Sequence, residues 1–331
     1  MKKLGLVLDG GGGRGAYQLG IWKYLKEIGL DKHIKVISGC SVGSLNSCLL
    51  AMDDYDMAYG IWTNEVKDKI ISADMDDIKN NITNYTSGKV TDTIIQFIAN
   101  TGIFSRDGLL EIINKYINLK LISKQNISIY ATATHLPSCD AKNFKLNGRS
   151  DEEIIQILLA SSAIPFVFPT EEIENNLYMD GGMSDNSPLT PMYEENCTDI
   201  IVVHLDSTEV IMDKRENKAN IYEIYPSHNL GYFINGILDF SPNGAKKRIE
   251  QGYLDAKEKI GSIFKTDNNK YEIIKKENTD DKNNSLKDLI TDTINKTIEN
   301  INDTKKEIVS ELKIKIMNEV KEYLIKQDMK Y

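Results

Sequence analysis

A five-residue turn with the pattern G-x-S-x-G, at residues 39–43, constrains this chain more than any other stretch. It follows a short apolar run and precedes an apolar segment rich in small residues at 44–52. Strand, turn and helix in this order are typical of a nucleophile elbow, which lifts a reactive serine above the edge of a sheet. Gly39 and Gly43 lack the Cβ atoms that would collide where the chain turns so sharply. We therefore take Ser41 as a candidate nucleophile at the positive end of the following helix.

A second glycine-rich turn, at residues 9–15, joins a predicted buried strand at 4–8 to a predicted helix at 16–28. Backbone N–H groups at the start of such a helix are unpaired and converge on a negatively charged group. The turn contains the dinucleotide fingerprint G-x-G-x-x-G, but the next predicted strand ends at 38–41 without the acidic residue that would hold a ribose. A nucleotide cofactor is therefore the weaker interpretation. The stronger one is that these N–H groups serve Ser41, because adjacent parallel strands end at the same edge of a sheet.

Composition narrows the class of protein. The chain has 331 residues and a net charge of −9, which argues against nucleic acid as a partner. Its four cysteines show no C-x-x-C spacing, which favours a reducing compartment. The apolar part of the N-terminus is too short for a signal peptide, and no run approaches the ~18 apolar residues of a membrane span. We expect a cytoplasmic protein.

The apolar pattern predicts one large domain over residues 1–264 and a separate C-terminal part over 265–331. Within the domain, residues 53–125 are expected to form a mainly helical insertion. Its apolar stretch at 97–104 would either pack in the core or form a lid. The C-terminal part is expected to begin with a polar linker and to continue as helices, which would dock on the body or contact a membrane or partner.

Asp180 is the second chemical candidate, because serine needs a base within hydrogen-bond reach. It lies in an Asp-Gly-Gly sequence between a predicted strand end and a polar stretch. His204 and His228 both follow it, so the order of residues also permits a Ser–Asp–His triad. His204 falls in a predicted buried strand at 200–205, where we expect a hydrogen-bonded core histidine, and His228 lies in a polar connection. A Ser–Asp pair is therefore favoured, with the triad as the alternative.

Taken together, these blocks resemble the patatin-like phospholipase family. The resemblance covers roughly residues 3–260, and the order and spacing of the motifs agree. It is carried by D-G-G-G-x-R-G at 9–15, G-x-S-x-G at 39–43, the segment 160–169, D-G-G at 180–182 and a closing helix near 251–256.

The resemblance implies a three-layer α/β/α fold with a mainly parallel central sheet and a C-terminal helical extension. It also implies an acyl hydrolase with a Ser–Asp dyad, in which Ser41 attacks an ester carbonyl and Asp180 accepts its proton. The oxyanion loop would consist of Gly11, Gly12, Gly13 and Arg14, with Arg14 orienting the loop or meeting a substrate phosphate. No cofactor and no metal ion are expected.

The implied substrates are phospholipids or lysophospholipids, reached by transient contact with a membrane surface. A regulatory ligand or partner would act through the C-terminal helices. Two other classes of function stay open at this point. They are a catalytically silent lipid-binding or scaffold protein on the same fold, and an oxidoreductase with a nucleotide cofactor.

Overall fold

The computed structural model describes residues 2–70, 106–164, 168–207, 209, 211, 219–267 and 270–274. The expected apolar lid stretch at 97–104 and the expected C-terminal helices lie outside these residues.

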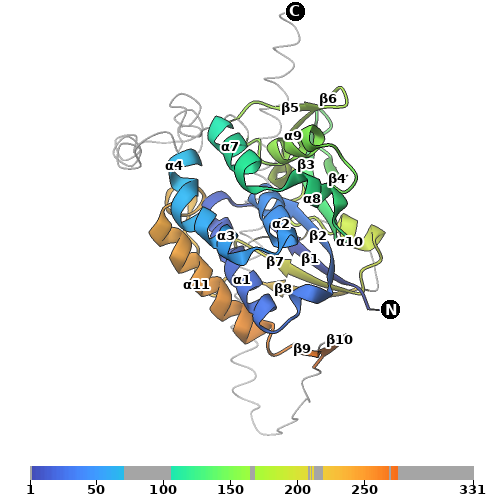
Figure 1. Cartoon of the computed structure of the whole chain (residues 1–331), viewed down its shortest axis with the longest axis vertical. Coiled ribbons are helices and arrows are strands. Elements are labelled where there is room, and N and C mark those ends of the chain that lie inside the picture. The colour runs from blue at the N-terminus through green and yellow to red at the C-terminus, as the bar shows by residue number, and fades with distance from the viewer. Residues whose placement is uncertain are drawn as a thin grey trace, which may run out of the picture.

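An eight-stranded sheet forms the centre of the molecule, with helices on both of its faces (Figure 1). The strand order is β5 (Glu171–Ile173), β6 (Asn176–Asp180), β3 (Ser128–Leu136), β2 (Ile34–Cys40), β1 (Leu4–Leu8), β7 (Asp199–Val203) and β8 (Asn220–Ile224), and β4 (Ala141–Lys145) also pairs with β3. Neighbouring strands from β3 to β8 along this order run parallel, whereas β4, β5 and β6 are antiparallel additions. The predicted three-layer fold with a mainly parallel sheet is confirmed.

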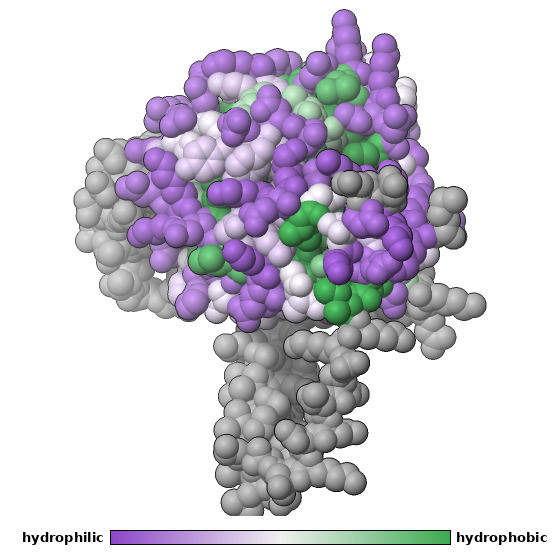
Figure 2. All heavy atoms as spheres, turned by 60° about the horizontal axis from the view of Figure 1, so that its bottom comes forward, coloured by the Kyte–Doolittle hydropathy of each residue, from purple (hydrophilic) through white to green (hydrophobic). Residues whose placement is uncertain are grey.

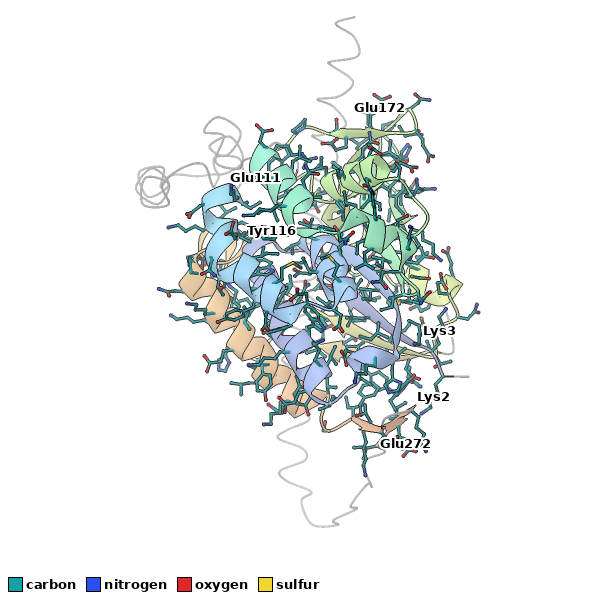
Figure 3. The ribbon with its side chains drawn as sticks, viewed as in Figure 1. Lys2, Lys3, Glu111, Tyr116, Glu172 and Glu272 are labelled. Carbon is teal, nitrogen blue, oxygen red and sulfur yellow. The ribbon has the colours of Figure 1, made fainter. Side chains whose placement is uncertain are left out.

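The described helices include the one predicted at 16–28 and the one predicted after the Ser41 turn. They are α1 (Ala16–Glu27), α2 (Val42–Met52), α3 (Tyr55–Gly60), α4 (Val66–Ile70), α7 (Arg106–Tyr116), α8 (Leu119–Lys124), α9 (Asp151–Ser161), α10 (Thr190–Glu194) and α11 (Pro242–Lys259), with π-helical turns η3 (Ile61–Glu65) and η5 (Phe233–Ile237). The described parts of the expected insertion are mainly helical, and Figure 3 shows Glu111 and Tyr116 on its helix α7. Residues 150–153 have the S-x-x-E pattern that predicts a capping box, and in the structure Ser150 and Glu153 form it at the start of α9.

The central strands are buried on both faces because helices cover the sheet from either side. Leu8 of β1 and Val203 of β7 pair with each other and belong to the larger apolar cluster. Val7 and Val202, the preceding pair, face the opposite side and pack in a second cluster with Met192 of α10. The residue that follows each strand therefore points to the α10 side.

The polar segment from residue 265 begins as a strand pair and not as a linker. β9 (Phe264–Asp267) and β10 (Lys270–Ile273) form an antiparallel hairpin, near which Figure 3 shows Lys2 and Glu272. Every second residue of the hairpin is polar and solvent-exposed, and for this reason the sequence resembles a linker. Tyr271 faces inward, and its hydroxyl donates a hydrogen bond to Asp199 Oδ2 at 2.7 Å.

Apolar side chains are gathered inside the molecule. The face shown in Figure 2 is mostly hydrophilic, and its hydrophobic residues form small, separate patches. Among the described residues, no helix has the length and apolar character needed to cross a membrane.

Helices α1 and α11 pack closely because each has a glycine at the contact (Figure 1). A Cβ on Gly20 would lie 2.0 Å from the carbonyl oxygen of Ile249, and one on Gly252 would lie 2.1 Å from that of Tyr17. A methyl group at either position would force the helices apart.

We predict that Gly20→Ala lowers the free energy of unfolding by about 1–3 kcal/mol, the usual cost of overpacking. Gly60→Ala is the matched control, since a Cβ there has no neighbour within 4 Å and the backbone is helical. It should be neutral or stabilising by up to about 1 kcal/mol. Urea unfolding of both variants measures the difference, and equal midpoints would contradict the close packing of α1 on α11.

Candidate active site

The turn between β2 and α2 has the geometry of a nucleophile elbow. Ser41 has φ 51° and ψ −122°, a conformation that is strained for a residue with a side chain. A Cβ on Gly39 would lie 2.2 Å from the carbonyl oxygen of Gly43, and one on Gly43 would lie 2.1 Å from that of Leu8. Only glycine fits at these two positions, as the sequence pattern predicts.

Asp180, the last residue of β6, lies beside Ser41. The Ser41 hydroxyl donates a hydrogen bond to Asp180 Oδ2 at 2.7 Å, and the N–H of Gly182 donates to Asp180 Oδ1 at 2.8 Å. The hydroxyl of Thr134 on β3 holds the Asp180 carbonyl oxygen at 2.8 Å. Both Ser41 and Asp180 are only 7 % exposed. The carboxylate is thus fixed with one oxygen aimed at the serine.

Ser161 contributes a contact that the sequence analysis did not assign. Its hydroxyl oxygen accepts a hydrogen bond from the backbone N–H of Ser41 at 3.0 Å and donates one to the carbonyl oxygen of Thr132 at 2.7 Å. The last turn of α9 is thereby tied to the elbow. The only signal in the sequence was the position of Ser161 in the segment ahead of Asp180.

The glycine-rich loop after β1 lies against the elbow. A Cβ on Gly10 would lie 3.0 Å from the Cβ of Ser41, so the two turns are in contact as predicted. Gly12 has φ 55° and packs against the carbonyl oxygen of Ile237, 2.3 Å from where its Cβ would be. Within the described part of the chain, no hydrogen bond uses the N–H of Gly11, Gly12 or Gly13.

Arg14 differs from the other residues of this loop. Its N–H donates to the carbonyl oxygen of Gly11 at 3.2 Å, so this amide is already engaged. Its side chain is about nine-tenths buried, and Nη1 forms an ion pair with Asp206 Oδ2 at 2.8 Å. These contacts fit the expectation that Arg14 orients the loop better than a role as an oxyanion donor or in contact with a substrate phosphate.

The loop that follows Asp180 also holds the glycine loop. Asn186 Oδ1 accepts a hydrogen bond from the N–H of Gly10 at 3.1 Å, and the hydroxyl of Ser187 donates to Asp9 Oδ1 at 2.7 Å. One segment therefore carries the carboxylate and positions the turn opposite it. The sequence signalled this segment only as a polar run after Asp-Gly-Gly.

His204 is a fully buried histidine with both ring nitrogens engaged. Nδ1 lies 2.8 Å from Asp9 Oδ2, and Nε2 lies 3.0 Å from Glu223 Oε1. Burial by itself would lower the pKa of His204, but the charge of Asp9 and the hydrogen bonds to Asp9 and Glu223 raise it to about 10. The expectation of a hydrogen-bonded core histidine is confirmed.

The hydrogen bonds of the two candidate histidines lead to groups other than Ser41 and Asp180. The ring of His204 is occupied by carboxylates other than Asp180, and His228 Nδ1 lies 3.0 Å from Ser227 Oγ in an exposed connection. Among the described residues, no group of three or more His, Cys, Asp or Glu side chains is arranged to hold a metal ion.

An apolar pocket opens beside Ser41 and runs along α2. Two aromatic rings of this pocket, Trp62 and Phe240, stack with centroids 6.3 Å apart. Asn46 and Ser162 supply its other polar side chains. The lining residues are Gly12, Ser41, Val42, Leu45, Asn46, Leu49, Ile61, Trp62, Val66, Ile70, Leu109, Ile112, Ile117, Ser162, Ile164, Phe168 and Phe240. Such a cavity suits a hydrocarbon chain and not a polar cofactor.

We predict that the stability contributed by His204 depends on pH. Its pKa is raised from 6.5 in the unfolded chain to about 10, so this contribution is complete below pH 6.5 and is lost as the pH rises to about 10. The free energy of unfolding of the wild type minus that of His204→Gln should therefore fall over this range. Urea unfolding at a series of pH values measures it, and a constant difference would contradict a charged His204.

Comparison with known proteins identifies the family of this chain. The patatin-like phospholipase family profile matches residues 6–193, which is more than half of the chain's 331 residues. The probable lipid hydrolase 463L of Invertebrate iridescent virus 6 is 26 % identical over 293 residues, covering 82 % of this chain and 89 % of the viral protein. The lysophospholipase NTE1 of Cryptococcus neoformans is 27 % identical over 210 residues, which cover 63 % of this chain but only 11 % of NTE1.

Among solved structures, VipD from Legionella pneumophila matches with a TM-score of 0.50 and 14 % identity, over 79 % of this chain and 67 % of VipD. This similarity concerns the fold alone. The chain belongs to the patatin-like phospholipase family.

Proposed function

We propose that this protein is a lipid ester hydrolase in which Ser41 is the nucleophile and Asp180 the base. One observation carries the proposal: the 2.7 Å hydrogen bond to Asp180 Oδ2 from the hydroxyl of Ser41, which lines an apolar pocket. A serine hydroxyl is a weak nucleophile unless a base accepts its proton, and this contact supplies the base.

In the reaction, Ser41 Oγ attacks the ester carbonyl carbon as its proton passes to Asp180. Oxygen charge that develops in the tetrahedral intermediate is received by the N–H groups of Gly11, Gly12 and Gly13. One such donor is worth roughly 2.7–4 kcal/mol of the barrier in enzymes where it has been measured. The protonated Asp180 then protonates the leaving alcohol, and water releases the acyl group by the reverse steps.

The substrate class follows from the pocket together with the relatives. An acyl chain placed along α2 would bury its methylenes at about 0.8 kcal/mol each, and the pocket offers almost no polar partners for anything else. NTE1 carries the name lysophospholipase, and 463L is called a probable lipid hydrolase. Phospholipids and lysophospholipids are accordingly the proposed substrates, reached by transient contact with a membrane surface.

We predict that Ser41→Ala and Asp180→Asn each lower kcat for a p-nitrophenyl ester by at least about 10³-fold, because each removes one half of the dyad. Ser41→Ala should also abolish labelling by a fluorophosphonate. The exposed residues Ser262 and Asp56 provide matched controls, and Ser262→Ala and Asp56→Asn should keep wild-type activity. Undiminished hydrolysis or labelling in Ser41→Ala would overturn the proposed function.

A second prediction concerns the acyl pocket. Leu45 is half-buried on α2 and lines the pocket near Ser41, so Leu45→Trp should narrow the path of a long acyl chain. The kcat/KM ratio of a hexadecanoyl to a butanoyl p-nitrophenyl ester should fall at least about tenfold, the effect of losing a few buried methylenes. Leu121→Trp, at an exposed position of α8, is the control. An unchanged ratio in Leu45→Trp would place the acyl chain elsewhere.

A further inference from the structure

The ends of β1 and β7 bring two buried, oppositely charged side chains together. Leu8 pairs with Val203 in the parallel ladder, so Asp9 and His204 are the next pair, just beyond the last paired residues. Both are 0 % exposed. This is also where the strand order reverses, because the chain proceeds from β1 to β2 on one side and later returns to β7 on the other. Open α/β sheets place their sites at such a point.

A continuous chain of hydrogen bonds crosses this point on the α10 side of the sheet. It runs from the Ser187 hydroxyl to Asp9, from Asp9 to His204, and from His204 to Glu223. The ring of Tyr225 stacks on that of His204 with centroids 4.3 Å apart, and its hydroxyl donates to Glu223 Oε1 at 2.7 Å. Both ring nitrogens of His204 are engaged by carboxylates that do not belong to the dyad.

Asp9 is the anchor at the start of the oxyanion loop. Four glycines follow it, and none has a side chain that could fix the position of its own N–H group. Asp9 itself is held at three points. Its N–H donates to the carbonyl oxygen of Val203 at 3.2 Å, its own carbonyl oxygen accepts from Gln18 Nε2 at 2.8 Å, and its carboxylate contacts Ser187 and His204.

The carboxylate of Asp9 needs a positive partner because a fully buried anion is costly unless it is paired. Within the part of the chain that the structure describes, His204 is the basic side chain that contacts it, at 2.8 Å. The nearest alternative in the loop, Arg14, is bonded to Asp206. Without His204, the buried carboxylate of Asp9 would lose its charged partner and would have to rotate towards water, which would shift the peptide that leads into Gly10.

We propose that His204 is a positioning residue for the oxyanion hole: through its contact with Asp9 it fixes the N–H groups of Gly11, Gly12 and Gly13 without touching Ser41 or Asp180. The inference rests on the proposed function of this site. His204 would thus affect the reaction rate, although the proposed dyad of Ser41 and Asp180 contains no histidine.

The test begins with His204→Gln, which keeps a hydrogen-bonding side chain and removes the charge. On a soluble butanoyl p-nitrophenyl ester at neutral pH, kcat should fall about 10- to 100-fold while KM changes less than about twofold. This is less than the 10²–10³-fold cost of deleting one oxyanion donor, because the donors are displaced and not removed. His228→Gln, at an exposed histidine, is the matched control and should match the wild type. Titration of Ser41 with a fluorophosphonate corrects every rate for the folded fraction.

A second readout separates loop positioning from general loss of structure. An alkyl trifluoromethyl ketone forms a hemiketal when Ser41 Oγ adds to its carbonyl carbon and the hydroxyl proton passes to Asp180, which places an oxyanion in the hole. Its Ki should rise in His204→Gln by the factor by which kcat/KM falls, as for a transition-state analogue. The Ki of the corresponding fatty acid, which forms no such adduct, should stay unchanged.

The double variant Asp9→Asn/His204→Gln tests the charge pair itself. Two neutral amides can bond to each other without a buried unpaired anion, so kcat should recover at least about threefold over His204→Gln alone. If His204→Gln does not fold, Glu223→Gln removes the outer partner, which is 38 % exposed, and should change kcat and the ketone Ki in the same direction by a smaller factor.

Each result bears on one hypothesis. Wild-type kcat and ketone Ki in folded His204→Gln, or in Glu223→Gln if only that variant folds, would overturn the positioning role. So would a loss of about 10⁴-fold together with loss of labelling, because that would make the imidazole part of the chemistry. Activity that survives Ser41→Ala would instead overturn the proposed function.

Discussion

The hydrogen bond between Ser41 and Asp180 joins two strands that are not neighbours in the sheet. β3 lies between β2 and β6, so the two side chains meet across β3 near Ala133, which pairs with Asp180. Some residues around this hydrogen bond must be glycines, because there is no space for side chains at their positions. A Cβ on Gly181 would lie 2.3 Å from the carbonyl oxygen of Thr132, and the elbow has no room for a side chain at Gly43. The glycines of the motifs are thus consequences of how tightly three chain segments converge.

Buried charged side chains hold the remaining parts of the site in position. Arg248 of α11 is 5 % exposed, and its guanidinium donates to the carbonyl oxygens of Leu230, Asn235 and Asp239 and to the carboxylate of Asp239. The loop it organises packs against Gly12 and Gly13. Arg14, His204 and Arg248 each have an acidic partner, as buried cations must. The glycine loop, which has little rigidity of its own, is therefore held from several sides.

The sequence predicted the local structure of the site well because each motif is a short-range constraint. The strand before residue 9, the elbow at Ser41 and the capping box at Ser150 depend on neighbouring residues and were found where expected. The sequence prediction was wrong where a polar composition made two strands resemble a linker. The hairpin of β9 and β10 was interpreted as a linker because exposed polar residues alternate with inward-facing ones such as Tyr271.

By itself, the sequence determined the buried strands at 4–8 and 200–205, the two glycine turns and, by family resemblance, the pairing of a serine with an aspartate. Spacing along the chain carries that information. Only the tertiary structure decided which strand lies on the other side of β1, and with it that His204 reaches Asp9 from 195 residues away. The physical reason is that strand adjacency across a switch point is set by the packing of the whole sheet, and no local periodicity records it.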